Sequence, residues 1–515
     1  MPHCMETWMC LIGLDVGTTG VKALAFDEEG RRLSSAYREY ELAHPQPGWS
    51  EIRDRDLRDG IRHVLSSLAP EAKKEARALA VSSQAQAVVP VDRNGNALAD
   101  IIVTFDGRTV PQYEWWRDNF APLELFQKTG VPLSSIYTVN KIMWYRDNLP
   151  DVFERAWKFL CVQDYAQFLL SSETKIDFSL AGRTMMFDPA AMTWNREILG
   201  LAGIPEEKLS TPVPSTAVIG SIKRDTAEEL GLPSNLRLVA GGHDQCCGAL
   251  GSGVDRPGMA MNATGTIDAL LAVLPEPRVT EALFRMNMCC YPYVEEGSYA
   301  VMAINPNGGL LFKWYKDAFC GEEAALAKAR GSDVYTDLIT TAAPAPADVY
   351  VLPHLEGAGT PILDPESLGA FVGLRVSHRK PDICRGVLDS IAYDMRQNIE
   401  AMEEAGIPIA EIRAIGGGAK TARWLQIKAD VFNRPIATLN AGESAALGAA
   451  MLAGTGTGVF KSLREAADAM VTVRDTFHPN PAMREEYDDR YRIYLSLYPS
   501  LKQFNRRISR RSRMR

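Results

Sequence analysis

Residues 11–27 read LIGLDVGTTGVKALAFD and predict a strand, a tight turn and a second strand. Apolar residues run up to Asp15, Gly17 and Gly20 interrupt them, and a second apolar run ends at Asp27. Glycine lets a turn bend sharply and lets a ligand approach the backbone, and successive amides in such a turn cradle an anion. Two interpretations remain open: a phosphate-binding hairpin of an ATP-using enzyme, or an ordinary hairpin with a Gly-Thr turn.

The side chains in and beside this turn have the chemistry that a bound nucleotide needs. Thr18 and Thr19 supply hydroxyl donors, and Lys22 supplies a cation for phosphate. Asp15 is suited to Mg²⁺, which prefers one or two carboxylates together with phosphate oxygens. The cofactors predicted from this stretch are therefore ATP and Mg²⁺.

The length and composition of the chain limit the classes of protein it belongs to. Its 515 residues are enough for two or more domains, and 46% hydrophobic with 23% charged residues is typical of a soluble globular protein. The net charge of −8 argues against a nucleic-acid partner. No apolar run approaches the ~20 residues of a membrane-spanning helix. The start shows no secretion signal and the nine cysteines no CxxC spacing, so we expect reduced thiols and a cytoplasmic location.

Polar residues follow two predicted strands. Residues 78–83 predict a buried strand, and strands of open α/β sheets present ligand groups at their carboxyl ends, which places Gln84 and Gln86 at a pocket for a polyhydroxylated ligand. Asp106 ends another apolar strand and is predicted to face the same pocket. A polar loop and a surface ion pair between Asp106 and Arg108 explain these residues equally well.

Residues 238–243, LVAGGH, predict a buried strand that breaks at the double glycine. Asp244 follows, at the point where a helix would begin. It is either the N-cap of that helix or a carboxylate aimed into a cleft as a general base, since the glycines let a ligand come close.

A second hairpin of the same kind is predicted at residues 259–273, with Gly265 and Thr266 in its turn. This weak internal repeat predicts two related domains that each present a phosphate hairpin to a shared cleft. Glycine at a helix start, as at Gly309, lets amides reach a phosphate, and the triple glycine at 416–418 leaves bare backbone for a nucleotide. The predicted domains are residues 11–254 and residues 255–500.

The chain ends in a basic segment, residues 501–515, which is predicted to be a disordered, solvated tail.

Three motifs occur in an order and spacing that resemble the FGGY carbohydrate kinases, a family that includes xylulokinase, glycerol kinase and ribulokinase. They are GLDVGTT at 13–19, GGHDQ at 241–245 and GGGAK at 416–420, and the likeness covers nearly all of residues 11–500. The resemblance implies an α/β fold of two actin-like (ribonuclease-H-like) domains, with ATP and sugar meeting in a central cleft. Homodimers are frequent in this family, so a homodimer is possible by analogy.

The resemblance also implies roles for the matching residues. Asp244 would take the proton from the sugar hydroxyl, Gln245 would contact the sugar beside it, and Asp15 would help to place Mg²⁺. Phosphate or nucleotide contacts are implied for Thr18, Thr19, Lys22, Gly265, Thr266, Gly309, Gly417, Gly418 and Thr421.

Departures from the family pattern leave the acceptor open. The second hairpin continues as Ile267-Asp268 where the family usually has Ser-Gly, and Ala85-Gln86 matches neither glycerol kinases nor xylulokinases. Because residues 106–108, Asp-Gly-Arg, follow the xylulokinase pattern, we expect transfer of the ATP γ-phosphate to a small ketose or polyol, xylulose-like first. The alternatives are a glycerol- or tetritol-type polyol kinase, an actin-like ATPase without a sugar acceptor, and a non-catalytic sugar- or nucleotide-binding protein.

Overall fold

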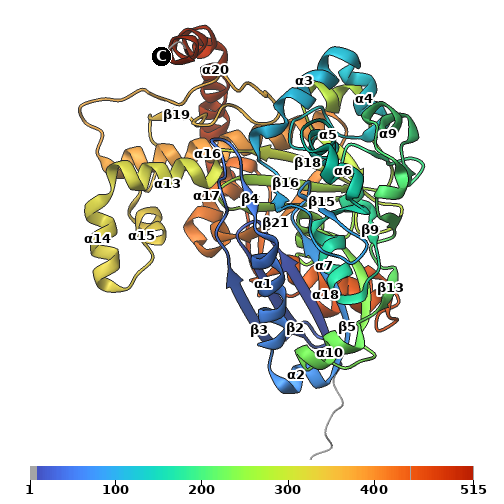
Figure 1. The fold of residues 1–515 in the computed structure, drawn as a ribbon. Coiled ribbons are helices and arrows are strands. Elements are labelled where there is room, and N and C mark those ends of the chain that lie inside the picture. Colours follow the sequence, from blue (N-terminus) through green and yellow to red (C-terminus); the bar gives the residue numbers. More distant parts are fainter. Residues whose placement is uncertain (1–8, 441, 514–515) are drawn as a thin grey trace, which may run out of the picture.

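The computed structural model describes residues 9–440 and 442–513, which are organised around two large mixed sheets (Figure 1). In hydrogen-bonded order, the first sheet consists of β13 (Val218–Ser221), β14 (Arg237–His243), β5 (Ala76–Ser83), β1 (Cys10–Val16), β2 (Gly20–Phe26) and β3 (Arg32–Glu39). The second consists of β17 (Cys289–Pro292), β18 (Tyr299–Asn305), β16 (Asp268–Leu274), β15 (Gly258–Thr264), β21 (Ile409–Gly416), β22 (Ile436–Leu439) and β23 (Val473–Phe477).

The two sheets share the same core connectivity. β1 pairs antiparallel with β2 and parallel with β5, which pairs parallel with β14. In the second sheet β15 pairs antiparallel with β16 and parallel with β21, which pairs parallel with β22. Each sheet is therefore built on one of the two predicted glycine hairpins, which confirms the predicted α/β architecture of two related domains.

Shorter strands and the helices surround these sheets. A four-stranded sheet consists of β4 (Glu51–Ile52), β7 (Ile101–Ile102), β6 (Val88–Val91) and β8 (Lys158–Cys161). The two-stranded pairs are β9 (Lys175–Asp177) with β12 (Thr211–Val213), β10 (Phe187–Asp188) with β11 (Thr193–Trp194), and β19 (Tyr350–Leu352) with β20 (Ala370–Val372). The helices up to the end of the first half are α1 (Asp54–Ser66), α2 (Pro70–Lys74), α3 (Val110–Asn119), α4 (Pro122–Thr129), α5 (Thr138–Asn148), α6 (Pro150–Arg155), α7 (Val162–Ser171), α8 (Phe178–Ala181), α9 (Arg196–Ala202), α10 (Arg224–Leu230) and α11 (Asp244–Leu250). The later helices are α12 (Glu281–Arg285), α13 (Gly308–Phe319), α14 (Gly321–Arg330), α15 (Val334–Thr341), α16 (Lys380–Glu404), α17 (Ala422–Phe432), α18 (Ser444–Gly456), α19 (Leu463–Met470) and α20 (Arg484–Arg513).

Helix α18 lies between β22 and β23 of the second sheet in the chain but packs on the first sheet, against β1, β5 and β14, and against α11. Two glycines permit this close approach. A Cβ at Gly13 would lie 1.8 Å from the carbonyl oxygen of Ala446, and one at Gly448 would lie 1.9 Å from that of Cys247. The strands of the first sheet all precede the predicted boundary at residues 254 and 255, and those of the second sheet all follow it. Helix α18 follows the boundary in the chain but packs on the first sheet.

Strand β14 does not break at its double glycine. It runs through a bulge between Val239 and Gly241, where Gly241 takes a φ of +82°, and ends at His243. His243 is the N-cap residue of α11 and Asp244 is its first helical residue, so the N-cap interpretation of Asp244 is wrong.

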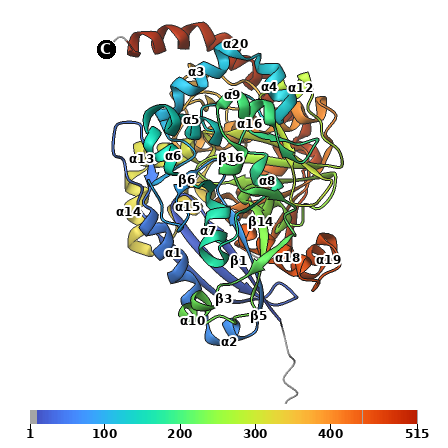
Figure 2. The same ribbon diagram turned by 45° about the vertical axis from the view of Figure 1, so that its right-hand side comes forward.

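The basic segment is not disordered where the structure describes it, because α20 continues to Arg513. Figures 1 and 2 show α20 projecting from the body of the molecule with the C-terminus at its free end. Tyr498 donates a hydrogen bond to Asp364 and Asn505 donates one to the carbonyl of Leu368, so the helix is attached to the rest of the chain as far as Asn505. Residues 514–515 lie outside the described residues.

Candidate active site

One cavity of about 510 Å³ in the second domain brings together segments that are far apart in the chain. We call it the glycine pocket. Its lining is Thr264, Gly265, Thr266, Gly308, Gly309, Phe312, Asp333, Tyr335, Thr336, Ile339, Leu388, Ile391, Gly417, Gly418, Lys420, Thr421 and Trp424. Six of the nine predicted nucleotide residues lie in this list, from the second hairpin, the start of α13 and the triple glycine.

Three of the five glycines of this pocket, Gly308, Gly309 and Gly418, stand where a side chain does not fit. A Cβ at Gly309 would lie 2.0 Å from the carbonyl oxygen of Gly265, and one at Gly418 would lie 2.6 Å from Cβ of Thr264. The turn of the second hairpin is thus packed directly on the backbone of two other segments. Bare backbone with free amides is the arrangement that lets phosphate or ribose approach closely.

A buried lysine forms hydrogen bonds and an ion pair with side chains of the second hairpin. Lys428 of α17 donates hydrogen bonds of 2.7 Å to Asn262 and to Thr264, and its Nζ lies 3.3 Å from Oδ2 of Asp268. Asp268 is one of the two residues that depart from the family pattern, and it forms a buried ion pair with Lys428. The sequence analysis missed Lys428, although a carboxylate inside a predicted buried hairpin is a sign that a buried cation lies nearby.

The predicted phosphate residues of the first hairpin lie outside the glycine pocket. The Thr18 hydroxyl donates to Oε1 of Gln84 (2.8 Å), whose Nε2 donates to the carbonyl of Gly17 (3.3 Å). Gln84 therefore contacts the turn of the first hairpin, and its predicted binding of the acceptor stays a prediction. Thr19 lies in the same turn, where its carbonyl accepts a hydrogen bond from the amide of Tyr40.

Lys22 pairs with a carboxylate from the other half of the chain. Its Nζ lies 2.7 Å from Oε2 of Glu443, just before α18. The pair is about one-third exposed, with 34% of the Lys22 and 40% of the Glu443 side chain accessible, so solvent screens it. Lys22 thus remains within reach of solvent and of an anion.

Asp244 is a carboxylate whose charge is disfavoured. Burial, and then the negative charge of Asp15, raise the pKa of Asp244 to about 7, and burial likewise raises the pKa of Asp15. The side chain is still 29% exposed, and Nε2 of His243 lies 3.2 Å from its Oδ1. Burial holds the pKa of His243 well below its usual range, so the imidazole is neutral. A carboxylate with a pKa near neutrality is suited to accept a proton from an alcohol.

The carboxylate of Asp15 is the candidate Mg²⁺ ligand. It accepts a hydrogen bond of 2.9 Å from Ser82, and the nearby Asp244 gives the site two like charges that a cation would relieve. In residues 9–440 and 442–513, no group of three or more His, Cys, Asp or Glu side chains is arranged to hold a metal. The donor set therefore fits Mg²⁺ only together with phosphate oxygens and water, as that ion commonly binds.

Asp106 is buried in an ion pair and does not line the glycine pocket. Its carboxylate accepts hydrogen bonds from Nε (2.7 Å) and Nη2 (2.8 Å) of Arg108 and from the amide of Ser50 (2.6 Å). Both side chains of the pair are buried, with 0% and 2% accessible. The ion pair foreseen as the alternative exists, buried instead of on the surface, and acceptor binding by Asp106 stays a prediction.

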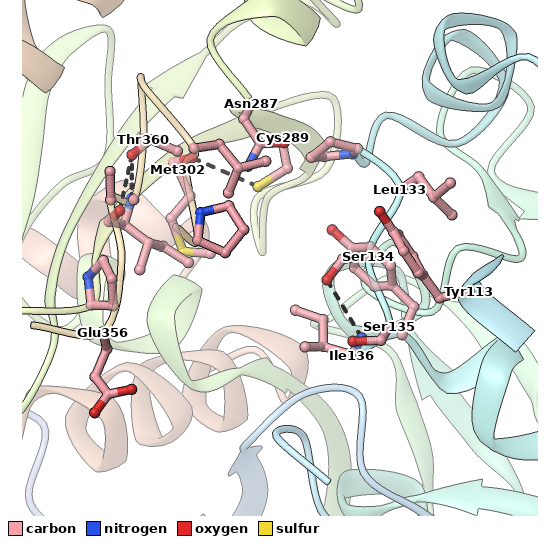
Figure 3. Close-up of a pocket in the computed structure, with 18 of the residues that line it drawn as sticks. Tyr113, Leu133, Ser134, Ser135, Ile136, Asn287, Cys289, Met302, Glu356 and Thr360 are labelled. Carbon is pink, nitrogen blue, oxygen red and sulfur yellow. Dashed lines mark hydrogen bonds between the residues drawn. The ribbon is translucent and has the colours of Figure 1, made fainter. Parts of the chain in front are cut away.

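A second cavity, of about 540 Å³, lies between the two domains, and we call it the interdomain pocket. The first domain contributes Tyr113, Pro132, Leu133, Ser134, Ser135, Ile136, Tyr137 and Arg183. The second contributes Asn287, Cys289, Met302, Ile304, Pro306, Glu356, Ala358, Gly359, Thr360, Leu363 and Pro365. Figure 3 shows these two walls facing each other across an open space. None of the five residues predicted to bind the acceptor lines this pocket.

Arg183 connects the interdomain pocket with the predicted site residues. The side-chain amide of Gln86 is oriented so that its nitrogen and its oxygen both have hydrogen-bond partners. The nitrogen then donates to the carbonyl of Ala85, and the oxygen accepts from Nε (3.1 Å) and Nη2 (2.9 Å) of Arg183. The charge of Arg183 also acts on Asp244, whose pKa it lowers against the larger effect of burial. Gln245, beside Asp244, has an Oε1 with no hydrogen-bond partner among the described residues. The sequence analysis missed Arg183, although it is the one charged residue in the run between Asp177 and Asp188.

Two family models match this chain. The N-terminal domain of the FGGY family of carbohydrate kinases matches residues 10–251, and the C-terminal domain of that family matches residues 260–457. The chain belongs to the FGGY carbohydrate kinases. This confirms the predicted family, the enzyme class and a sugar kinase activity, in place of an actin-like ATPase or a non-catalytic binding protein.

Individual relatives of this FGGY kinase agree over nearly its whole length. A xylulose kinase of Staphylococcus epidermidis is 29% identical over 501 residues, which cover 96% of this chain and 97% of the relative. A gluconokinase of Bacillus subtilis is 26% identical over 497 residues, 95% of either chain. The solved xylulose kinase of Rhodospirillum rubrum superposes with a TM-score of 0.87 at 26% identity, over 96% of this chain and 99% of that one. These likenesses confirm the two-domain actin-like fold.

None of the helices in the described part of this kinase has the length and apolar character needed to cross a membrane.

Proposed function

We propose that this FGGY kinase transfers the γ-phosphate of ATP to a hydroxyl of a small polyhydroxylated acceptor, with Asp244 as the general base. The observation that carries this proposal is the carboxylate of Asp244, which burial and the charge of Asp15 bring to a pKa of about 7. A base of this pKa is half ionised at neutral pH and takes up a proton readily as the alcohol attacks.

The two hairpins supply the rest of the site. Phosphoryl transfer depends mainly on positioning and on stabilising charge on the transferred group. In this proposal Gly265, Gly309 and Gly417, which line the glycine pocket, contact the nucleotide. Thr18 and Lys22 of the first domain contact the phosphates, which would replace their present partners Gln84 and Glu443.

Mg²⁺ bound with ATP would neutralise charge on the phosphate oxygens. In this proposal Asp15 holds the ion, and Ser82, which donates to Oδ1 of Asp15, orients that carboxylate.

The acceptor is the finer part of the proposal. A xylulose-like ketose is the first expectation, and a glycerol- or tetritol-type polyol is the second. The relatives named above include a xylulose kinase and a gluconokinase that match over nearly the same length, so overall similarity does not separate a ketose from a sugar acid. A homodimer stays an expectation from the resemblance, and a cytoplasmic location stays an expectation from the sequence. Eight cysteines are buried and unpaired among the described residues, as expected of reduced thiols.

Acceptor-dependent release of ADP tests the proposal. The purified chain, Mg·ATP and a panel of ketopentoses, pentitols, tetritols, glycerol and aldonates are combined, and ADP is measured by a coupled assay. We expect one class of acceptor to raise ADP release far above the basal rate, with mass spectrometry showing one added phosphate per acceptor. ADP release that no acceptor changes would contradict the proposal.

A further inference from the structure

We propose that Arg183 binds a carboxylate of the acceptor, so that the acceptor is a polyhydroxy acid, an aldonate or ketoaldonate, and not a neutral sugar. The inference rests on the proposed function, because it names the substrate class of the same site.

Arg183 is a buried cation without a counter-charge. Four arginines are at least nine-tenths buried among the described residues, and three of them form ion pairs: Arg108 with Asp106 and Glu51, Arg385 with Asp389, and Arg396 with Glu400 and Asp488. Arg183 is 3% exposed, and no described carboxylate lies within 4.0 Å of its guanidinium. Because an uncompensated buried charge is costly, such a group is expected to have a partner that arrives from outside.

The contacts of Arg183 leave part of the guanidinium free. Nε and Nη2 donate to the neutral amide of Gln86, and Nη1 has no acceptor within residues 9–440 and 442–513. The guanidinium lies 4.9 Å from the ring centre of Tyr291 and 5.6 Å from that of Tyr137, and these rings give it an electron-rich but uncharged surrounding. A planar guanidinium in a low-dielectric wall binds carboxylate strongly and with defined orientation.

The position of Arg183 suits an acceptor that reaches the base. Its side chain lines the interdomain pocket and donates to Gln86, one of the residues predicted to bind the acceptor, and its charge acts on Asp244. Ser134 and Ser135 offer hydroxyls to the polyol chain. Glu356, the one carboxylate in the lining, lies on the opposite side of the pocket from these serines in Figure 3, and its charge disfavours the acid group at that end.

The test compares acceptors of equal carbon number that differ only in charge. Aldonates are measured against the alditol and the ketose of the same length by coupled ADP release, with the wild type, Arg183→Met and Arg183→Lys. We expect the wild type to prefer the aldonate. In Arg183→Met, which keeps the length of the side chain without its charge, kcat/KM for the aldonate falls roughly 10- to 100-fold, mainly through KM, as expected for a hydrogen bond to a charged group. For the neutral acceptor we expect a much smaller change, and Arg183→Lys should fall between.

Two outcomes would overturn the proposal. One is a wild type that prefers the neutral acceptor, and the other is an equal loss for acid and neutral acceptors in Arg183→Met, which indicates a purely structural side chain. Binding without ATP separates this failure from that of the proposed function. An aldonate that raises the melting temperature of the wild type but not of Arg183→Met supports the carboxylate site even when no acceptor is phosphorylated, and an aldonate that binds neither protein rejects it.

Discussion

The two cavities have nearly the same volume, about 510 Å³ for the glycine pocket and about 540 Å³ for the interdomain pocket, but they are built differently. The first is lined largely by backbone at glycine turns within one domain. The second is lined by side chains from both domains, without a glycine motif on the first-domain wall. Six predicted nucleotide residues lie in the first, and no predicted acceptor residue lies in the second.

This difference explains why the sequence predicts the nucleotide-binding residues more readily than the acceptor-binding residues. A ligand recognised by backbone requires glycine where a Cβ would collide, as at Gly309 and Gly418, and a glycine cluster is conspicuous in a sequence. A ligand recognised by side chains uses Ser, Tyr and Ile, which occur equally in ordinary cores. The comparison also predicts that the two pockets respond separately to mutation.

Asp244→Asn is the change with the largest expected effect. The amide keeps the size of the side chain but does not take up the proton of the acceptor hydroxyl, and general-base catalysis contributes on the order of 10²–10⁴ in rate. We expect kcat to fall by about that factor, measured as acceptor-dependent ADP release. Calorimetric affinity for Mg·ADP should be unchanged, because Asp244 does not line the glycine pocket. Near-normal turnover would contradict the assignment of the base.

The parts of the molecule that the sequence predicted are those with local signatures. The hairpins β1–β2 and β15–β16 were predicted from apolar runs that glycines interrupt. The resemblance to the family was likewise carried by short glycine-containing motifs. The N-cap interpretation of Asp244 failed because β14 absorbs its double glycine in a bulge. The packing of α18 on the first sheet has no local signature in the sequence. Glycines such as Gly13 and Gly448 allow another segment to come close, but the sequence does not indicate which segment that is.

The side chains of the site were harder to place for the same reason. Gln84 directly follows β5, whereas Asp106 lies beyond the end of β7 at Ile102. Gln84 hydrogen-bonds to the first hairpin and Asp106 forms a buried ion pair with Arg108, contacts that the sequence did not show. Lys428 lies in α17, and Arg183 lies in the segment that follows α8. Their partners lie 160 and 97 residues away along the chain, at Asp268 and Gln86, so only the folded structure brings them together.

Gly309→Ala tests the backbone character of the glycine pocket. Its Cβ would lie 2.0 Å from the carbonyl oxygen of Gly265 and would push on the second hairpin. Overpacking of this kind costs about 1–3 kcal/mol, so we expect KM for ATP to rise by about tenfold. The KM for the acceptor should change much less, which initial rates with each substrate varied in turn will show.

The matched control is Gly321→Ala, at the start of α14, where no atom lies within 4 Å of the added Cβ. This variant should keep the wild-type KM for ATP. An equal rise in both variants, or a rise in the acceptor KM alone for Gly309→Ala, would break the distinction between the two pockets.

The pH dependence of turnover is the smallest of the expected effects. With a pKa of about 7, Asp244 is protonated below neutrality and ionised above it, so kcat/KM for the acceptor should rise with pH and level off above about pH 8. At pH 6.5 roughly one carboxyl in four is ionised, and the rate should be about fourfold below its plateau.

Burial acts to raise the pKa of Asp333 in the glycine pocket, but hydrogen bonds from Thr336 lower it below its ordinary value, so Asp333 stays charged over this range. Affinity for Mg·ADP should accordingly vary much less than kcat/KM between pH 6.5 and 8. Titration of His243 does not account for the rise of kcat/KM with pH, since burial holds the pKa of His243 well below this range. A flat acceptor profile, or one that falls as the pH rises, would mean that the group taking the proton is not a carboxyl of raised pKa.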